Sequence, residues 1–549
     1  MSRKATVFLS AFLALTFLLT ACSASGGGAA TTSEAAKTEA STSAAASTAP
    51  TESGRRTLSL MFAEPTTVED VNTNYATQYL SDKMDVDLTF NFLPSTEWQT
   101  KLEIMVSANE KLSDVLFGNL GASAVAKYGA SGVFLDLLPY YNESSVYIRE
   151  RFEEDPNIQK LCTFADGSMY AVARVQQQSH TDFGYKFFLN QQWLDNLNLE
   201  MPTTIDGLTD VLTAFRDDDP NGNNMQDELP MTGSSVSYAY DPTVFMMGSF
   251  TFFNVRHLLQ VEDGKINPAY VTDGWREGLR YCKMLYDEGL LDPMLFTQDL
   301  TQYKALLQKE GDTIVGSCML MNTSTFDGNP KMLEYTGVSP FKGPDGTQYA
   351  PYQTYSITYN GFITRDASDP AFAFQFLDYL WELDASMVIR YGEENVDWEW
   401  VPEGTPCLFE SSGYPATFRV ISNTQTGVQN KWWNVWSPMF LDYSIGNGWA
   451  DDGDPMNIFR IAYDTVGKLQ GYIPDEVAGM IVYTVDENTQ IAEISSNITS
   501  YWKECKTLFI IGDMDLDSDW DSYLAELDKL GLQEYLEVTQ NAYTRTYSD

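Results

Sequence analysis

The sequence predicts an α/β protein with a mostly parallel β-sheet. Segments with strand character alternate with segments of helical character from Thr57 onward, at the spacing of strand–helix–strand units. Hydrophobic residues make up 44% of the chain and aromatic residues 13%, which is typical of a globular protein and too aromatic for an acidic disordered one. The residues beyond 54 are numerous enough for two or more domain-sized cores.

The first part of this pattern places two polar residues at the edge of the sheet. Period-2 alternation predicts strands, and amphipathic spacing predicts helices between them, at 57–62, 67–83, 87–92, 96–111 and 113–117 in chain order. Ligands of such sheets bind beyond the carboxyl ends of the strands. Glu64 and Asn119 follow the first and third strands, so both are candidates for the edge of a pocket, although solvated loop residues fit the same positions.

The first 54 residues predict export and a lipid anchor. A basic start and an apolar run from Val7 to Leu19 are typical of a signal peptide over residues 1–21, and the run is too short to span a bilayer. Leu19-Thr20-Ala21-Cys22 resembles the lipobox of bacterial lipoproteins, which implies lipid on Cys22; an ordinary signal peptide is the alternative. Residues 22–54 are rich in Ala, Ser and Thr and lack aromatics, so we expect a disordered tether.

Charge and cysteine content exclude several classes of protein. The net charge of −42 argues against nucleic acid, which demands basic patches, and suits an exported domain with a neutral or cationic ligand. Five cysteines remain beside Cys22; they are odd in number and scattered, so neither a disulfide framework nor a zinc motif is predicted.

A loop rich in oxygen-bearing side chains predicts a structural calcium site. Ca²⁺ prefers six to eight oxygen ligands, and alternate residues of a tight loop supply them. The loop departs from an EF-hand because Asn224 replaces the usual Gly and Pro230 stands where a carboxylate would close the site. A metal-free Asn/Gly turn is the alternative. The predicted ligands are Asp219, Asn221, Asn223, the carbonyl of Met225, Asp227 and Glu228.

The same region resembles family 1 extracellular solute-binding proteins, with the large Gram-positive lipoproteins and the alginate-binding proteins among the most similar members. The resemblance includes Trp193-Leu194-Asp195 and covers most of the chain after the tether. Its specific motifs are those at 219–230 and 391–399. It implies a structural calcium in the 219–228 loop. It also implies two lobes that are discontinuous in sequence, joined by hinge strands around a ligand cleft: 57–172 with 336–384, and 173–335 with 385–512. The helical segment 513–549 then packs on the lobes.

Aromatic residues are the candidates for the ligand site, because sugars stack their apolar faces on aromatic rings. Trp193, Trp381 and Trp520 lie on helical patterns and are expected in the core. The predicted ligand-binding rings are Tyr170, Trp275, Trp400, Trp432 and Trp433.

The resemblance implies a carrier and not an enzyme. On this hypothesis the chain is a monomeric, lipid-anchored component of an ABC importer on the outer face of the cytoplasmic membrane of a Gram-positive bacterium. It captures a carbohydrate, expected to be an oligosaccharide, and delivers it to a membrane permease. A secreted glycoside hydrolase and a binder of peptides or other small solutes are the alternatives. With 76 acidic residues, a catalytic pair of carboxylates cannot be recognised from sequence.

Overall fold

A mixed β-sheet forms the centre of the first lobe. The computed structural model describes residues 54–355, 357–422, 427–433 and 436–547, so Cys22 and the predicted signal peptide and tether through residue 53 lie outside the described residues. Within them, the sheet has six strands, in spatial order β13 (Met439–Leu441), β4 (Val172–Gln176), β10 (Thr358–Ile363), β3 (Val115–Leu120), β1 (Arg56–Ala63) and β2 (Val86–Leu93). The three strands predicted from the alternating pattern are confirmed as β1, β2 and β3.

Strand directions place one edge of this sheet toward the second lobe. β1 is parallel to β2 and β3, β13 is parallel to β4, and β10 runs antiparallel to both of its neighbours. The carboxyl ends of β1, β3, β4 and β13 therefore lie at the same edge. The chain leaves this edge after β4 and β13 to enter the second lobe, and it returns to the same edge at the start of β10.

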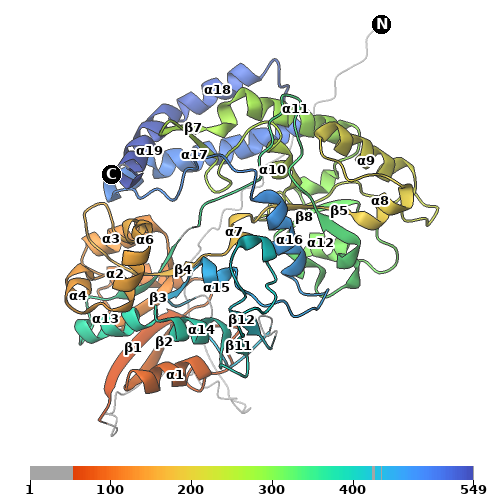
Figure 1. Ribbon diagram of the computed structural model, residues 1–549. Helices are drawn as coiled ribbons and strands as arrows, with labels where there is room; N and C mark the ends of the chain where they lie inside the picture. Colours follow the sequence, from red (N-terminus) through yellow and green to blue (C-terminus); the bar gives the residue numbers. More distant parts are fainter. Residues whose placement is uncertain (1–53, 356, 423–426, 434–435, 548–549) are drawn as a thin grey trace, which may run out of the picture. The chain divides into compact units, whose positions relative to one another are not determined.

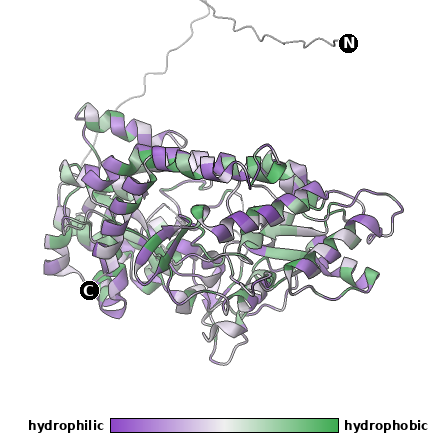
Figure 2. Ribbon diagram, turned by 90° about the horizontal axis from the view of Figure 1, so that it is seen from above, coloured by the Kyte–Doolittle hydropathy of each residue, from purple (hydrophilic) through white to green (hydrophobic). Residues whose placement is uncertain are grey.

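Helices surround the sheet of the first lobe (Figure 1). α1 and α2 are shorter than predicted, because the residues before each of them form turns. The helices are α1 (Tyr75–Lys83), α2 (Trp98–Ser107), α3 (Ala122–Ala130), α4 (Leu138–Ser144), α5 (Tyr147–Glu154), α6 (Pro156–Cys162), α13 (Pro370–Tyr379) and α14 (Leu383–Tyr391). Hydrophilic and hydrophobic residues alternate along the helices, as expected for elements with one buried face (Figure 2).

The second lobe is built on a smaller sheet. Its described strands are β8 (Ser317–Leu320), β5 (Lys186–Asn190) and β9 (Tyr335–Gly337), with β5 central and antiparallel to both. Thr204 caps α9 (Ile205–Asp217), since its hydroxyl accepts from the Gly207 N–H at 3.1 Å. The helices are α8 (Gln191–Leu197), α9 (Ile205–Asp217), α10 (Pro242–Met247), α11 (Asp273–Asp287), α12 (Leu300–Leu307) and α16 (Arg460–Leu469).

Three segments of the described chain cross between the lobes. The first runs from β4 through α7 (Ser179–Asp182) to β5, and the second runs from β9 to β10. The third runs from β13 through α15 (Tyr443–Gly446) to α16, which packs on β5 and β9. These crossings are the hinge that the family resemblance implies.

The structure corrects two of the expected lobe assignments. The start of 336–384, expected in the first lobe, belongs with the second lobe, because β9 pairs with β5. Residues 385–512 are expected in the second lobe, but β13 pairs with β4 of the six-stranded sheet and α14 packs against β13. β13, from late in the chain, thereby completes the hydrogen bonding of β4 on that side. The first part of 385–512, through β13, therefore belongs with the first lobe. It also carries the hairpin of β11 (Trp398–Trp400) and β12 (Phe418–Val420).

A helical C-terminal region packs on the second lobe. α17 (Val485–Ile511) lies along α11, and α18 (Trp520–Lys529) and α19 (Leu532–Tyr547) pack on α17. α19 also contacts the hairpin of β6 (Leu259–Glu262) and β7 (Lys265–Pro268). The expectation that three tryptophans lie in the protein core is confirmed. Trp193, Trp381 and Trp520 are 1%, 1% and 4% exposed.

One close contact packs α3 against Tyr170, just before β4. Gly129 lies on the ring of Tyr170, and a Cβ added at Gly129 would stand 2.4 Å from that ring. We expect Gly129→Ala to lower the free energy of unfolding by about 1–3 kcal/mol, because a buried ring has no room to move. Gly471→Ala is the matched control, since its Cβ would meet no atom within 4 Å. Equal urea midpoints for the two variants would contradict the contact.

Candidate functional site

A cavity of about 820 Å³ opens beside the hinge on the second lobe. Its walls come from the loop 235–241, the segment 253–258 and the exposed face of α17, and the crossing segments contribute Tyr185 and Gln353. A cavity of this volume lies in the range that accommodates a small-molecule ligand. Its position next to the crossings means that a ligand bound there is adjacent to the axis of lobe movement.

Aromatic rings and neutral hydrogen-bonding groups dominate this pocket. Tyr238 is 53% exposed, and its ring meets Tyr185 edge-on with centroids 5.4 Å apart. Exposed ring faces stack well on the C–H faces of sugars, while hydroxyls and amides pair with sugar hydroxyls. The aromatic lining residues are Tyr185, Tyr238, Phe253, Phe296 and Trp502, and the neutral polar ones are Ser235, Ser237, Gln353, Thr499 and Thr507.

Charged side chains line part of the pocket, among them Arg256, Lys503 and Glu504. Lys506 of α17 donates to the Asp241 carboxylate at 2.6 Å, and both side chains are almost fully buried. Burial lowers the pKa of His257 to about 4, so this ring is neutral at neutral pH. Its Nδ1 lies 3.3 Å from the Leu259 N–H, which makes Nδ1 the acceptor and leaves Nε2 to donate to the Gly479 carbonyl. Asp241, Lys506 and His257 therefore present little net charge to the pocket, and its hydroxyls and amides can pair with a hydroxyl-rich ligand.

A buried group of ionisable residues lies behind the pocket at the first crossing. The Asp182 carboxylate accepts from the Tyr443 hydroxyl at 2.7 Å and is 4% exposed. Burial raises the pKa of Asp182 to about 7, against the opposing effects of Tyr443, Lys186 and Arg256. Burial lowers the pKa of Lys186 to about 7 as well, and its ammonium donates to the carbonyls of His180 and Met321 at 2.8 and 2.9 Å.

The predicted calcium loop has its oxygen ligands turned inward. Asp219, Asn221, Asn223, Asp227 and Glu228 are half-buried, whereas the side chains of residues 224–226 are exposed. The Asp219 carboxylate closes the loop by accepting from the backbone N–H groups of Asn223 and Asn224 at 3.1 and 3.0 Å. Asn224 has φ 60°, so it takes the left-handed conformation that an EF-hand gives to Gly.

Glu228 is the member of this loop that most needs a cation. Its Oε1 is buried and has no hydrogen-bond partner among the described residues. Burial, together with repulsion from Asp227 and Asp219, raises the pKa of the Glu228 carboxyl. No group of three or more His, Cys, Asp and Glu side chains in the described chain is placed to hold a metal. The loop instead combines carboxylates with amide and backbone oxygens, a donor set that fits Ca²⁺.

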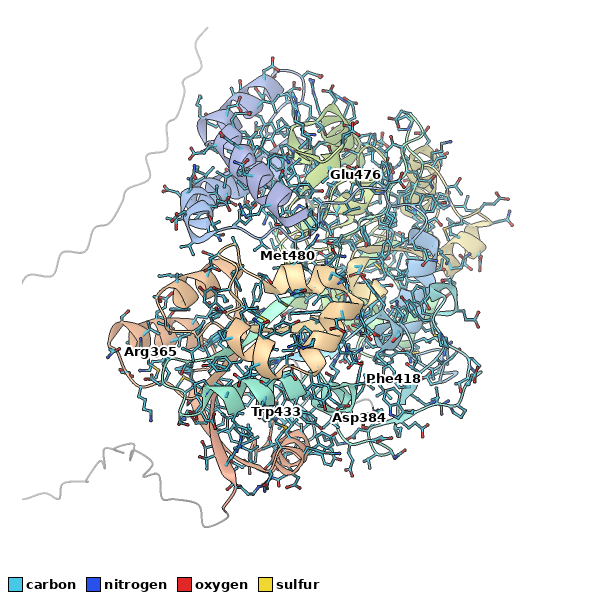
Figure 3. All side chains as sticks on the ribbon, turned by 60° about the vertical axis from the view of Figure 1, so that its left-hand side comes forward. Arg365, Asp384, Phe418, Trp433, Glu476 and Met480 are labelled. Atoms are coloured by element: carbon cyan, nitrogen blue, oxygen red, sulfur yellow. The ribbon has the colours of Figure 1, made fainter. Side chains whose placement is uncertain are left out.

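Most of the aromatic residues predicted for the ligand site lie in the core. Trp432 is 4% exposed and Trp275 is 3% exposed. Trp433 is 0% exposed, lies within the first lobe (Figure 3) and donates from Nε1 to the Thr77 hydroxyl at 2.8 Å. Tyr170 is 7% exposed and donates to Asp166 at 2.7 Å. Their burial corrects the expectation of exposed rings, since none of these four offers a free face in this conformation.

The other predicted ligand residues remain accessible. Glu64 and Asn119 are exposed at the carboxyl ends of β1 and β3, on the edge of the first lobe where the crossings leave the sheet. Trp400 is half-buried and meets Trp398 edge-on with centroids 5.0 Å apart. None of the three lines the cavity beside the hinge.

The pocket-lining aromatics were missed by sequence reasoning. Tyr238 lies in the irregular stretch Gly233–Tyr240, rich in Ser, where an aromatic ring has no helical or strand period to bury it. That pattern could have identified it. Trp502 could not be found this way, because it lies in the middle of a 27-residue helix whose exposed face is decided by packing on α11.

Two α/β lobes joined by three crossings, with a pocket beside the crossings on the second lobe, are an arrangement that the comparisons place in a known family. Residues 69–382 match the family described as bacterial extracellular solute-binding protein, and the chain belongs to this family. The family assignment agrees with the expectation of a carrier and not an enzyme. In the described part of the chain, no helix combines the length and apolar character that crossing a bilayer requires.

Two relatives illustrate the similarity. The fructooligosaccharide ABC transporter substrate-binding protein FusA of Streptococcus pneumoniae is 24% identical over 529 residues, which cover 89% of this chain and 90% of FusA. The structure of a FusA EF-hand mutant with fructo-nystose has a TM-score of 0.72 at 21% identity, covering 89% and 99% of the two chains. A solute-binding protein for HMO from Bifidobacterium longum infantis has a TM-score of 0.76 at 19% identity, covering 90% and 100%.

Asp182 makes the stability of the protein depend on pH. Its folded pKa of about 7 lies above the unfolded value of about 3.9, so the folded state holds a proton that the unfolded state has lost. The resulting stabilisation is fully present below about pH 4 and is lost as the pH rises through about 7. Lys186, with its lowered pKa, acts mainly above this window.

We therefore expect the thermal midpoint of the wild type, relative to Asp182→Asn, to fall between pH 4.5 and 7.5. The asparagine keeps the size of the side chain and does not titrate, and the other ionisable groups cancel in the difference. Midpoints that run parallel over this range would show that Asp182 is ionised throughout.

Proposed function

We propose that the protein is the extracellular substrate-binding component of an ABC importer and captures an oligosaccharide. The observation that carries this proposal is the hinge pocket, in which five aromatic rings are interleaved with hydroxyl and amide groups. Family membership supports the carrier role, and the names of FusA and the HMO-binding protein support a carbohydrate ligand. Glu64 and Asn119 lie where the first lobe would approach a bound sugar on closure.

In this proposal, lobe closure is the step that links ligand binding to transport. A ligand shifts the protein toward the closed state only if it binds that state more tightly than the open one. The proposed cycle is capture in the hinge pocket, closure about the three crossings, and docking of the closed form on a membrane permease. α17 forms one wall of the pocket and is packed along α11 of the second lobe, and it also contacts α3 of the first lobe.

The proposal includes a lipid anchor and a calcium ion. Lipid on Cys22 and a flexible tether would hold the carrier at the outer face of the cytoplasmic membrane, as a monomer within reach of its permease. Calcium in the 219–228 loop would be structural: Asp219, Asn221, Asn223, Asp227, Glu228 and the Met225 carbonyl would hold it. The unpartnered Glu228 Oε1 and the EF-hand mutant of FusA support this site.

The pocket is tested by substitution of its most exposed ring. We expect Tyr238→Ala to weaken binding of an oligosaccharide such as nystose by about tenfold or more, because loss of a stacking ring removes about 1.4 kcal/mol or more. Isothermal titration measures the affinity. Tyr414→Ala is the matched control, since Tyr414 is 38% exposed and lies outside the pocket lining.

The titration also separates the competing functions when a panel of neutral oligosaccharides, uronic-acid oligomers and short peptides is used. Binding without cleavage of a glycan supports the carrier. Cleaved sugar in the recovered sample would identify a glycoside hydrolase, and binding of peptides alone would refute the carbohydrate ligand. Equal losses for Tyr238→Ala and Tyr414→Ala would place the sugar elsewhere.

Calcium is tested through stability. At a Ca²⁺ concentration about 100 times Kd, one bound ion adds about 2.7 kcal/mol to the free energy of unfolding. We expect Ca²⁺ to raise the thermal midpoint of the wild type over EDTA and to have no effect on Asp219→Ala. Asp218→Asn is the control, because this exposed neighbour is not a predicted ligand. A Ca²⁺ response retained in Asp219→Ala would overturn the site.

A further inference from the structure

The three crossings meet in one hydrogen-bonded network around α7. Gln353, on the second crossing, donates from its backbone N–H to the Asp182 carbonyl at 3.0 Å. Tyr443, on the third crossing, donates to the Asp182 carboxylate at 2.7 Å. Asn447, farther along the third crossing, exchanges two hydrogen bonds of 3.0 Å with Ser179. Segments that are far apart in sequence are thereby bonded at a single short helix.

The same network reaches the ligand pocket. The Gln353 side-chain amide donates to the Tyr238 hydroxyl at 3.0 Å and to the Thr181 carbonyl at 3.3 Å. Tyr238 is the most accessible ring of the pocket, whereas Gln353 and Asp182 are 8% and 4% exposed. A continuous path of hydrogen bonds therefore runs from the pocket wall through Gln353 and α7 to Tyr443.

The far end of this path is attached to the first lobe. Tyr443 follows directly after β13, which pairs with β4 in the six-stranded sheet. Tyr238 stands at the other end, on a loop of the second lobe. Rotation of one lobe against the other must change the backbone angles of the crossings. Because the crossings share α7, we expect them to move together and not independently.

We propose that Gln353 and Asp182 are positioning residues that couple occupancy of the hinge pocket to the angle between the lobes. The proposal rests on the proposed function for the identity of the ligand, but the coupling network itself is present without one. A ligand hydroxyl that bonds the Tyr238 hydroxyl changes the partner of the Gln353 amide, and Gln353 transmits that change to α7. The buried Asp182 then holds β13 to α7 through Tyr443, so the first lobe follows.

Burial of a carboxylate at this place supports a role beyond packing. An isolated buried charge is strongly unfavourable, and a hydrophobic residue of similar size would fill the same space without that penalty. Asp182 is instead matched by a hydroxyl from another crossing and by the nearby positive charges of Lys186 and Arg256. Arg256 also lines the pocket, which brings the ligand site and the carboxylate into the same electrostatic environment.

The first measurement is the distance between the two lobes in the absence of a ligand. Spin labels are placed at Ile104→Cys on α2 and Leu333→Cys on the second lobe, whose native side chains are 54% and 50% exposed. The five cysteines of the described residues are buried, and Cys22→Ser in the full chain removes the remaining thiol. We expect Tyr443→Phe, Gln353→Ala and Asp182→Ala each to broaden the distribution of label distances measured by double electron–electron resonance.

Two variants separate positioning from general loss of stability. Asp182→Asn retains an acceptor for the Tyr443 hydroxyl, so we expect it to restore the narrow distribution. Tyr303→Phe removes a buried hydroxyl that donates to the Met319 carbonyl inside the second lobe, and it should leave the distances unchanged. Unchanged distributions in Tyr443→Phe and Gln353→Ala, or equal broadening in Tyr303→Phe, would overturn the proposal.

The second measurement adds nystose as the probe. We expect Tyr443→Phe to weaken its binding by up to about tenfold, the effect of losing one buried hydrogen bond, although Tyr443 does not line the pocket. We expect the double variant Tyr238→Phe/Tyr443→Phe to lose less nystose affinity than the product of the two single fold-losses. The reason is that both substitutions interrupt the same hydrogen-bonded path. A product of independent losses would refute the coupling. If no glycan binds, the proposed function fails, and the ligand-free distances still decide the coupling.

Discussion

The hydrogen bonding of β4 is the constraint on which the rest of the structure depends. β4 pairs with β10 on one side and with β13 on the other, and both partners come from much later in the chain. A buried strand must complete its backbone hydrogen bonds on both sides. The chain therefore has to return twice to the first lobe after building the second. Discontinuous lobes and a bundle of crossing segments at one place are the direct consequence.

Crossing segments in a protein interior need partners for their own polar groups. Here the partners are other crossings: α7 is bonded to the second crossing by Gln353 and to the third by Tyr443 and Asn447. Lys186, at the start of β5, donates to backbone carbonyls and is 0% exposed. These bonds hold the three crossings together at α7. The pocket opens directly beside the crossings, so a ligand bound in it would lie next to the segments that join the lobes.

The pocket shows how an acidic chain can present a nearly neutral site. The net charge of −42 is spread over the surface, while Asp241 is paired with Lys506 and His257 is held neutral by burial. Hydroxyls, amides and aromatic rings line the pocket together with Arg256, Lys503 and Glu504. Net charge far from zero favours solubility in general, whereas local pairing of charges sets the chemistry of a pocket.

The sequence by itself determined the local features of this protein. Period-2 alternation predicted β1, β2 and β3, helical spacing placed Trp193, Trp381 and Trp520 in the core, and the composition of 219–228 predicted an inward-turned oxygen loop. Each of these depends on residues close together in the chain. Local propensity and periodicity are sufficient for such features.

The tertiary structure decided which aromatic rings face the ligand pocket. Trp432 and Trp433 lack a regular period, yet contacts with the region around α1 and β3 bury them. Tyr238 and Trp502 line the pocket because α17, from the end of the chain, lies opposite the loop 235–241. The burial of a side chain is set by residues hundreds of positions away, and these contacts cannot be read from local periodicity. The assignment of β13 to the first lobe has the same cause.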